Sequence, residues 1–117
     1  MIQLSVIIAV YNEEDNIKPL INNINKVFLQ SGIEYEVIFV DDGSVDNTVK
    51  VIIENISSNI TLIELKRNFG QTAAMKAGID HADGEYIATL DGDLQNDPED
   101  ILMILASVTQ AEIFNRA

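Results

Sequence analysis

The chain has 117 residues, and 7 Lys and Arg against 19 Asp and Glu give it a formal net charge of −12. This length and a hydrophobic content of 47% predict one domain, spanning 1–117, and argue against disorder. No apolar run approaches the roughly 20 residues that cross a bilayer, no secretory signal is visible, and the lack of cysteine excludes disulfides and thiolate sites. The acidity argues against nucleic acid as a partner, because phosphate binding needs clustered Lys and Arg.

Apolar runs alternate with amphipathic stretches along the whole chain. In order, we expect strand, helix, strand, helix, strand, helix, strand and helix at Leu4–Val10, Glu14–Gln30, Glu36–Val40, Asp46–Ile56, Thr61–Leu65, Gln71–Ala82, Tyr86–Leu90 and Pro98–Thr109. The β-branched runs are typical of buried parallel strands, and the alternation predicts an α/β fold, Rossmann-like, with a mostly parallel sheet and helices on both faces.

Short local signals support two of these helices. Ser44 or Asp46 can cap the second helix. Small residues on the third, among them Ala74 and Gly78, predict that it packs closely on the sheet. The only histidine, His81, falls near the end of that helix, and we interpret it as structural or exposed.

Polar residues follow the first two expected strands, at the edge where open α/β sheets bind ligands. Tyr11, Asn12 and Glu13 come after the first strand, and an aromatic ring beside an amide suits a nucleobase or ribose. The same residues can equally be a helix-capping sequence. Asp41 and Asp42 come after the second strand, where an acid can accept hydrogen bonds from ribose hydroxyls or a base N–H. A turn explains one aspartate there better than two.

The segment after the fourth strand carries two further carboxylates. Asp91 and Asp93 point to the same side if the backbone stays extended, and Gly92 between them allows close approach of a ligand. With Gln95 as a neutral oxygen donor, this set suits Mg²⁺ or Mn²⁺, which is usually held by one or two carboxylates and substrate phosphates. The sequence therefore predicts a metal–nucleotide site here. Lys66, Arg67 and Lys76 are basic residues that could approach a diphosphate.

Four segments, at 6–14, 40–48, 65–80 and 90–100, together resemble a known family. VIIAVYNEE, VDDGSVDNT, LKRNFGQTAAMKAGID and LDGDLQNDPED, in this order and spacing, resemble the N-terminal half of family 2 inverting glycosyltransferases of the GT-A fold. Within that family they are most similar to the polyprenyl-phosphate glycosyltransferases, such as dolichol-phosphate mannose synthases and undecaprenyl-phosphate glucosyltransferases.

The resemblance implies roles for individual residues and for partners. A nucleotide-diphosphate sugar, UDP- or GDP-linked, is expected as donor and a polyprenyl phosphate as acceptor, at the cytoplasmic face of a membrane and in cell-wall or lipopolysaccharide synthesis. The implied nucleotide-binding residues are Tyr11, Asn12, Glu13, Asp41, Asp42, Lys76, Asp91 and Gly92. Asp91, Asp93 and Gln95 are the implied metal ligands, and the first two are the implied catalytic pair. The implied reaction is a metal-assisted displacement with inversion at the anomeric carbon.

Two departures from the family pattern accompany the resemblance. Ala9 stands where the family usually has proline, which removes no ligand, and Ala111–Ala117 does not follow the pattern. The acceptor half of the family would follow Ala117, so we expect a truncated chain that binds nucleotide sugar without transferring it. An uncovered strand edge would favour a homodimer or poor solubility.

Other classes fit the residues less well. A receiver domain would have its acid pair after the first strand, a sugar-1-phosphate nucleotidyltransferase would have a glycine-rich basic loop there, and an NAD-binding domain would have G-x-G-x-x-G. Here the aspartate pairs follow the second and fourth strands, Tyr-Asn-Glu-Glu follows the first, and no G-x-G-x-x-G occurs. The alternative that stays open is a non-catalytic fragment that binds nucleotide sugar.

Overall fold

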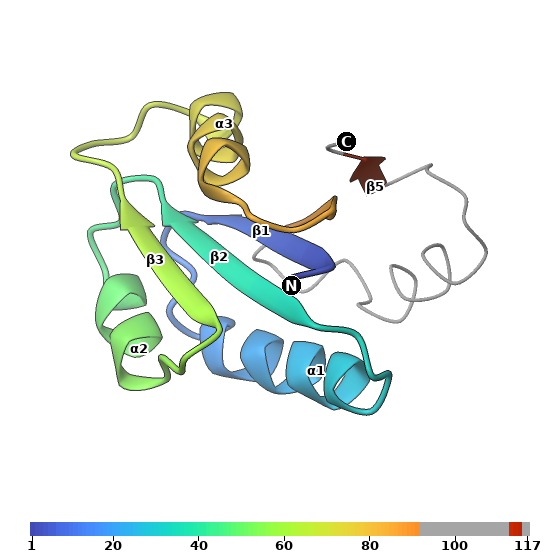
Figure 1. The fold of residues 1–117 in the computed structure, drawn as a ribbon. Helices are drawn as coiled ribbons and strands as arrows, with labels where there is room; N and C mark the ends of the chain where they lie inside the picture. Colours follow the sequence, from blue (N-terminus) through green and yellow to red (C-terminus); the bar gives the residue numbers. More distant parts are fainter. Residues whose placement is uncertain (92–112, 116–117) are drawn as a thin grey trace.

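The computed structural model describes residues 1–91 and 113–115, which form one five-stranded sheet with helices on both faces (Figure 1). In chain order the elements are β1 (Leu4–Val10), α1 (Ile17–Leu29), β2 (Tyr35–Asp41), α2 (Thr48–Glu54), β3 (Ile60–Glu64), α3 (Gln71–His81), β4 (Tyr86–Asp91) and β5 (Ile113–Asn115). The strand order is β3-β2-β1-β4-β5. The first four strands are parallel to their neighbours, and β5 is antiparallel to β4.

The alternation of side chains along β1 divides the core into two layers. Val6, Ile8 and Val10 pack with the buried face of α1. Ile7 points to the other face and packs with Ala74 of α3. Figure 1 shows the same division, with α1 and α2 on one face of the sheet and α3 on the other. Both faces of the central strands are therefore buried, as the apolar runs predicted.

The predicted strands are confirmed, with bounds that differ by at most one residue at either end. The close packing of α3 is confirmed as well, because a Cβ atom added at Gly78 would collide with the side chain of Ile7. His81 is exposed at the end of α3, as expected. The predicted helix at 98–109 lies outside the described residues.

Two helix starts were predicted too early. Helix α1 begins at Ile17 instead of Glu14, because the preceding residues form a separate turn, in which the N–H of Asn16 donates to the carbonyl oxygen of Glu13 at 2.9 Å. The N–H groups of Glu13 and Glu14 donate to the side chains of Thr48 and Asp46. Helix α2 begins at Thr48, and its N-cap position is Asn47, so neither predicted cap occupies it. Asp46 nevertheless accepts the N–H of Thr48 at 2.9 Å, whereas the Ser44 hydroxyl accepts a hydrogen bond from Asn12.

Candidate functional site

The residues predicted to bind a ligand gather at the carboxyl ends of the parallel strands. Val10, the last residue of β1, lies in register with Asp41 at the end of β2, and Ala9 lies in register with Asp91 at the end of β4. On the other side of β2, the N–H of Leu65 donates to the carbonyl oxygen of Asp41 at 2.9 Å. The loops that follow β1, β2 and β3, and the end of β4, therefore share one edge of the sheet.

Asp41 provides a buried carboxylate at the centre of this edge. Its side chain is only 3% exposed, and Oδ2 accepts the N–H of Ser44 at 3.1 Å. Oδ1 is fully buried and has no hydrogen-bond partner, and it is the one such side-chain atom among the described residues. A buried oxygen without a donor costs about 1–3 kcal/mol. Asp41 is therefore suited to accept a hydrogen bond from a ligand.

Asp42 is buried to a similar degree, at 5% exposed, but both of its carboxylate oxygens have donors. Oδ1 accepts the N–H of Phe69 at 2.8 Å, and Oδ2 accepts the N–H of Gly70 at 3.1 Å. The two adjacent aspartates therefore differ in their available chemistry. Asp41 has an oxygen left for a ligand, while Asp42 binds the loop between β3 and α3.

The loop after β1 is joined to the loop after β2 by reciprocal hydrogen bonds. The N–H of Asn12 donates to the Ser44 hydroxyl at 2.8 Å, and the side-chain oxygen of Asn12 accepts the N–H of Val45 at 2.9 Å. Asn12 adopts a positive φ of 54°, a conformation that asparagine tolerates better than most residues. The sequence suggested the side-chain amide of Asn12 for a contact with a nucleobase or ribose. The oxygen of that amide is instead hydrogen-bonded within the chain.

Glu13 is hydrogen-bonded to neighbouring residues, whereas the side chain of Tyr11 is partly exposed to solvent. The N–H of Glu13 donates to the Thr48 hydroxyl at 2.9 Å, and its Oε2 accepts from the Asn16 amide at 2.9 Å. Tyr11 directly follows β1 and is 45% exposed. Its ring remains available to a ligand at this edge. Asn12 and Glu13 thus act at least as loop contacts, but they do not cap α1, whose N-cap position is Asn16.

Asp46 also joins these two loops, and its titration reflects the contacts. Burial raises the pKa of this carboxyl, but hydrogen bonds from the Thr48 side chain and from the backbone of Thr48 and Glu14 outweigh burial. The net effect is a pKa below the ordinary value of 3.8. The charged form of Asp46 is therefore the one that holds the loops together.

The predicted metal ligands are described only in part. The backbone of Asp91 ends β4 beside β1, while Gly92, Asp93 and Gln95 lie outside the described residues. Within residues 1–91 and 113–115, no group of three His, Asp or Glu side chains could hold a metal ion. The structure therefore places the first of the predicted ligands at the right edge and gives no geometry for the others.

Lys76 lies on α3, near the end of β4. Together with Gln71, Thr72, Met75 and Ile79 of α3 and Thr89 of β4, it lines a cavity of about 540 Å³. Its ammonium group donates to Asp80 at 2.7 Å, and this hydrogen bond raises the pKa of Lys76. The pair is exposed, so the lysine is held only weakly and stays charged.

The other basic candidates lie in the loop after β3. The guanidinium group of Arg67 stands 4.2 Å from the centre of the Phe69 ring. Lys66, Arg67 and Phe69 are all exposed. This loop is adjacent to β2 rather than to β4.

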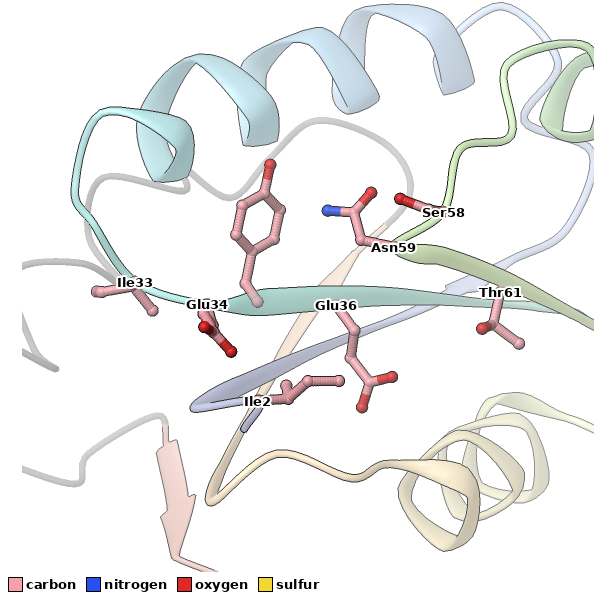
Figure 2. A pocket seen from close by; sticks show the side chains of 8 residues that line it. Ile2, Ile33, Glu34, Glu36, Ser58, Asn59 and Thr61 are labelled. Carbon is pink, nitrogen blue, oxygen red and sulfur yellow. The ribbon is translucent and has the colours of Figure 1, made fainter.

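A second buried carboxylate, Glu36, lies at the opposite end of β2 and was missed by the sequence analysis. It is 8% exposed, and its Oε2 accepts the Ser5 hydroxyl at 2.6 Å and the N–H of Asp83 at 2.7 Å. Figure 2 shows Glu36 on the α3 side of the sheet, beside a cavity of about 350 Å³ that Asn59 lines from the α1 side. A lone glutamate at a strand start carries no sequence signal for such burial.

A profile described as "Glycosyl transferase family 2" matches residues 5–113. The chain belongs to glycosyltransferase family 2. Its sheet is that of the GT-A fold, and the family and fold expected from the four motifs are confirmed.

Two curated relatives are polyprenyl-phosphate sugar transferases. The dodecaprenyl-phosphate galacturonate synthase of Rhizobium johnstonii is 41% identical over 115 residues, which cover 96% of this chain and 34% of that protein. The undecaprenyl-phosphate 4-deoxy-4-formamido-L-arabinose transferase of Proteus mirabilis is 45% identical over 111 residues, which cover 92% of this chain and 34% of that protein. The family 2 chain thus spans about a third of the length of these relatives.

Solved structures agree with this assignment. Staphylococcus aureus TarS in complex with UDP-GlcNAc superposes with a TM-score of 0.77 and 28% identity, covering 92% of this chain and 31% of TarS. The mannosyltransferase PcManGT of Pyrobaculum calidifontis, in complex with GDP-Man and Mn²⁺, superposes with a TM-score of 0.79 over 93% of this chain and 33% of that one. At 24% identity, the second comparison supports the fold alone.

Proposed function

We propose that this family 2 chain is the nucleotide-sugar-binding part of a glycosyltransferase whose acceptor is a polyprenyl phosphate. The observation that carries the proposal is the buried, unpaired Oδ1 of Asp41 at the carboxyl edge of the sheet. Such an atom needs a donor, and the N–H of a nucleobase or the hydroxyl of a ribose supplies one. The binding of UDP-GlcNAc by TarS supports the choice of ligand.

The neighbouring residues divide the remaining tasks along the edge. The exposed ring of Tyr11 offers an apolar surface for the nucleoside beside Asp41. Lys76 carries a positive charge beside β4, where the proposed diphosphate lies. Asn12 and Glu13 support the binding loop through their contacts with the loop after β2.

The expected metal ligands fit a divalent cation by their chemistry. Asp91, Asp93 and Gln95 are oxygen donors, the ligand type that Mg²⁺ and Mn²⁺ prefer, and Asp91 ends β4 at the same edge as Asp41. A cation bound there would supply Lewis-acid stabilisation of the departing nucleoside diphosphate. The acceptor phosphate is already anionic, so this chain has little need of a general base in an inverting displacement.

Calorimetric titration of UDP and GDP, each with Mn²⁺ and with EDTA, tests the proposal. We expect one of the two nucleotides to bind in Mn²⁺ only, and to stabilise the fold by about 2.7 kcal/mol at a hundredfold excess over its dissociation constant. Equal affinity in EDTA would reject the metal assignment. Failure of both nucleotides in Mn²⁺ would reject the nucleotide site.

The predicted ligand Asp93 can be tested within the same titration. Asp93→Asn keeps the shape of the side chain and removes one charge, so metal-dependent binding should weaken while the fold stays intact. If the variant unfolds and the folded fraction binds normally, Asp93 has a structural role instead.

A second candidate function is nucleotide-sugar binding without transfer. The extent of the match, about a third of each curated relative, favours it for residues 1–117 alone. We propose that acceptor contacts reside in the other two thirds of such proteins and that the complete enzyme acts at the cytoplasmic face of a membrane. Within the part of this chain that the structure describes, no helix is long and apolar enough to cross a bilayer.

An assay with radiolabelled UDP-glucose or GDP-mannose, Mn²⁺ and polyprenyl phosphate tests whether residues 1–117 transfer sugar by themselves. We expect no labelled lipid above a boiled control. Labelled lipid that Asp91→Ala abolishes would show that residues 1–117 suffice for transfer.

A further inference from the structure

The loop between β3 and α3, residues Lys66–Gly70, is attached to the end of β2 by one side chain. Asp42 accepts the N–H groups of Phe69 and Gly70 with its two oxygens. Because the carboxylate is buried, these charge-assisted hydrogen bonds are poorly screened by water. The attachment is therefore stronger than a surface contact between two loops.

The contact between the two loops is also sterically tight. Gly43, which follows Asp42, has a φ of 80°, and a Cβ atom added to it would lie 2.5 Å from the carbonyl carbon of Arg67 and from the backbone nitrogen of Asn68. Only a residue without a side chain lets the loop come this close. Asp42 and Gly43 together fix the loop directly beside Asp41.

The sheet order decides which part of a nucleotide the loop meets. From β3 to β4 there are three strand spacings, because the order is β3-β2-β1-β4. At 4.7–4.9 Å per spacing, the ends of β3 and β4 lie about 14 Å apart. The Lys66–Gly70 loop therefore begins at the far end of the edge from Asp91, where the diphosphate is proposed. It passes Asp42 and Gly43, next to the free oxygen of Asp41, before the chain enters α3 at Gln71.

We propose that Asp42 is a positioning residue, which holds the Lys66–Gly70 loop against the nucleoside end of the bound nucleotide; this inference rests on the proposed function. In this role Asp42 acts through the loop, because each of its oxygens accepts a backbone N–H, one from Phe69 and one from Gly70. The loop it holds carries Arg67 and Phe69, whose guanidinium group and ring are in contact, and the backbone of Arg67 passes directly beside Gly43. In this role Lys66 and Arg67 are assigned to the base and ribose, whereas the sequence predicted that they could approach the diphosphate.

Comparing the affinities for two ligands, one with and one without a nucleoside, distinguishes this positioning role from a general loss of folded structure. UDP or GDP, whichever binds the wild type, is titrated in Mn²⁺ alongside inorganic pyrophosphate, which lacks the nucleoside. For Asp42→Ala we expect the affinity for the nucleotide to fall about tenfold, the loss expected from one or two broken hydrogen bonds, and that for pyrophosphate to change by less than about twofold. An equal loss for both ligands, or no loss for either, would overturn the proposal.

Two further variants control for folding and charge. Gly43→Ala leaves the carboxylate in place but pushes the loop away, so it should reproduce the selective loss. Asp15→Asn removes an exposed carboxylate from the loop after β1 and should leave both affinities unchanged. A selective loss in Asp15→Asn as large as that in Asp42→Ala would show that net charge, and not the loop, is responsible.

Amide hydrogen exchange tests the attachment without any ligand. In the wild type, the amides of Phe69 and Gly70 should exchange slowly, and Asp42→Ala should accelerate both while the amides of α1 keep their protection. Unchanged exchange would overturn the proposal even if nucleotide binding fell. If the wild type binds neither nucleotide, the proposed function is wrong, and so is the proposed contact between the loop and the nucleoside. The hydrogen-exchange result then shows by itself whether Asp42 holds the loop.

Discussion

Strand β2 carries a buried carboxylate near each end, and the two differ in whether their oxygens have hydrogen-bond donors. At the amino end, Glu36 accepts two hydrogen bonds, from the Ser5 hydroxyl and the N–H of Asp83. At the carboxyl end, Asp41 has one buried oxygen without a partner. The same strand thus places one acid where the fold satisfies it and another where an oxygen is left for the proposed ligand. Burial alone therefore does not distinguish the two acids, whereas the unpaired oxygen of Asp41 does.

The comparison of the two acids predicts that Glu36→Ala has the largest effect, a loss of stability. The substitution leaves the buried Ser5 hydroxyl and the N–H of Asp83 without their acceptor, so the free energy of unfolding should fall by about 2–3 kcal/mol. Urea denaturation measures the loss. Glu34→Ala, which removes an exposed partner of the N-terminus, should change it by less than about 1 kcal/mol. If Glu36→Ala instead reduces nucleotide binding without loss of stability, Glu36 belongs to the site.

Asp41→Asn should weaken nucleotide binding without lowering stability. The amide oxygen can replace Oδ2 in accepting the N–H of Ser44, and this places an N–H₂ donor where the free acceptor was. Nucleotide affinity in Mn²⁺ should fall about tenfold or more, while the unfolding free energy stays equal or rises. Calorimetry and urea denaturation of the same preparation check both parts. A variant that loses stability but binds normally would make Asp41 a second structural acid.

Ser5→Ala sharpens the comparison at the amino end. The hydroxyl links Glu36 to the N–H of Gly84, which donates to it at 2.8 Å. Its removal should lower the unfolding free energy by about 1–2 kcal/mol and leave nucleotide affinity unchanged. Ser57→Ala, at an exposed position, serves as the matched control in thermal denaturation. Equal destabilisation by the two substitutions would mean that the buried network contributes nothing specific.

The smallest effect concerns pH at the carboxyl edge. Because the pKa of Asp46 is lowered in the folded chain, its contribution to stability is present above the ordinary value of 3.8 and is lost as the pH falls through the folded value. The difference in stability between wild type and Asp46→Asn should therefore be greatest near neutral pH and vanish in acid. Denaturation at a series of pH values measures it. A difference that persists at the lowest pH would show that the charge of Asp46 is not what joins the loops.

The sequence by itself determined the four parallel strands, because continuous β-branched runs have few other ways to be buried. It also determined that Asp41 and Asp91 share one edge, since the carboxyl ends of parallel strands always do. The family followed from the order and spacing of four motifs, each of which lies at a strand end or helix start.

Only the tertiary structure decided which residue at that edge does what. Asp41 and Asp42 are identical side chains one residue apart, and their difference depends on where the N–H groups of Phe69 and Gly70 lie, 27 and 28 residues away. The loop before α1 is held in the same way, by hydrogen bonds from Glu13 and Glu14 to side chains more than 30 residues away, Thr48 and Asp46. Strand β5 carries no pattern of its own over three residues and exists through its pairing with β4. Local sequence patterns report burial and backbone preference, but the partner of a polar atom is set by chain segments that meet only after folding.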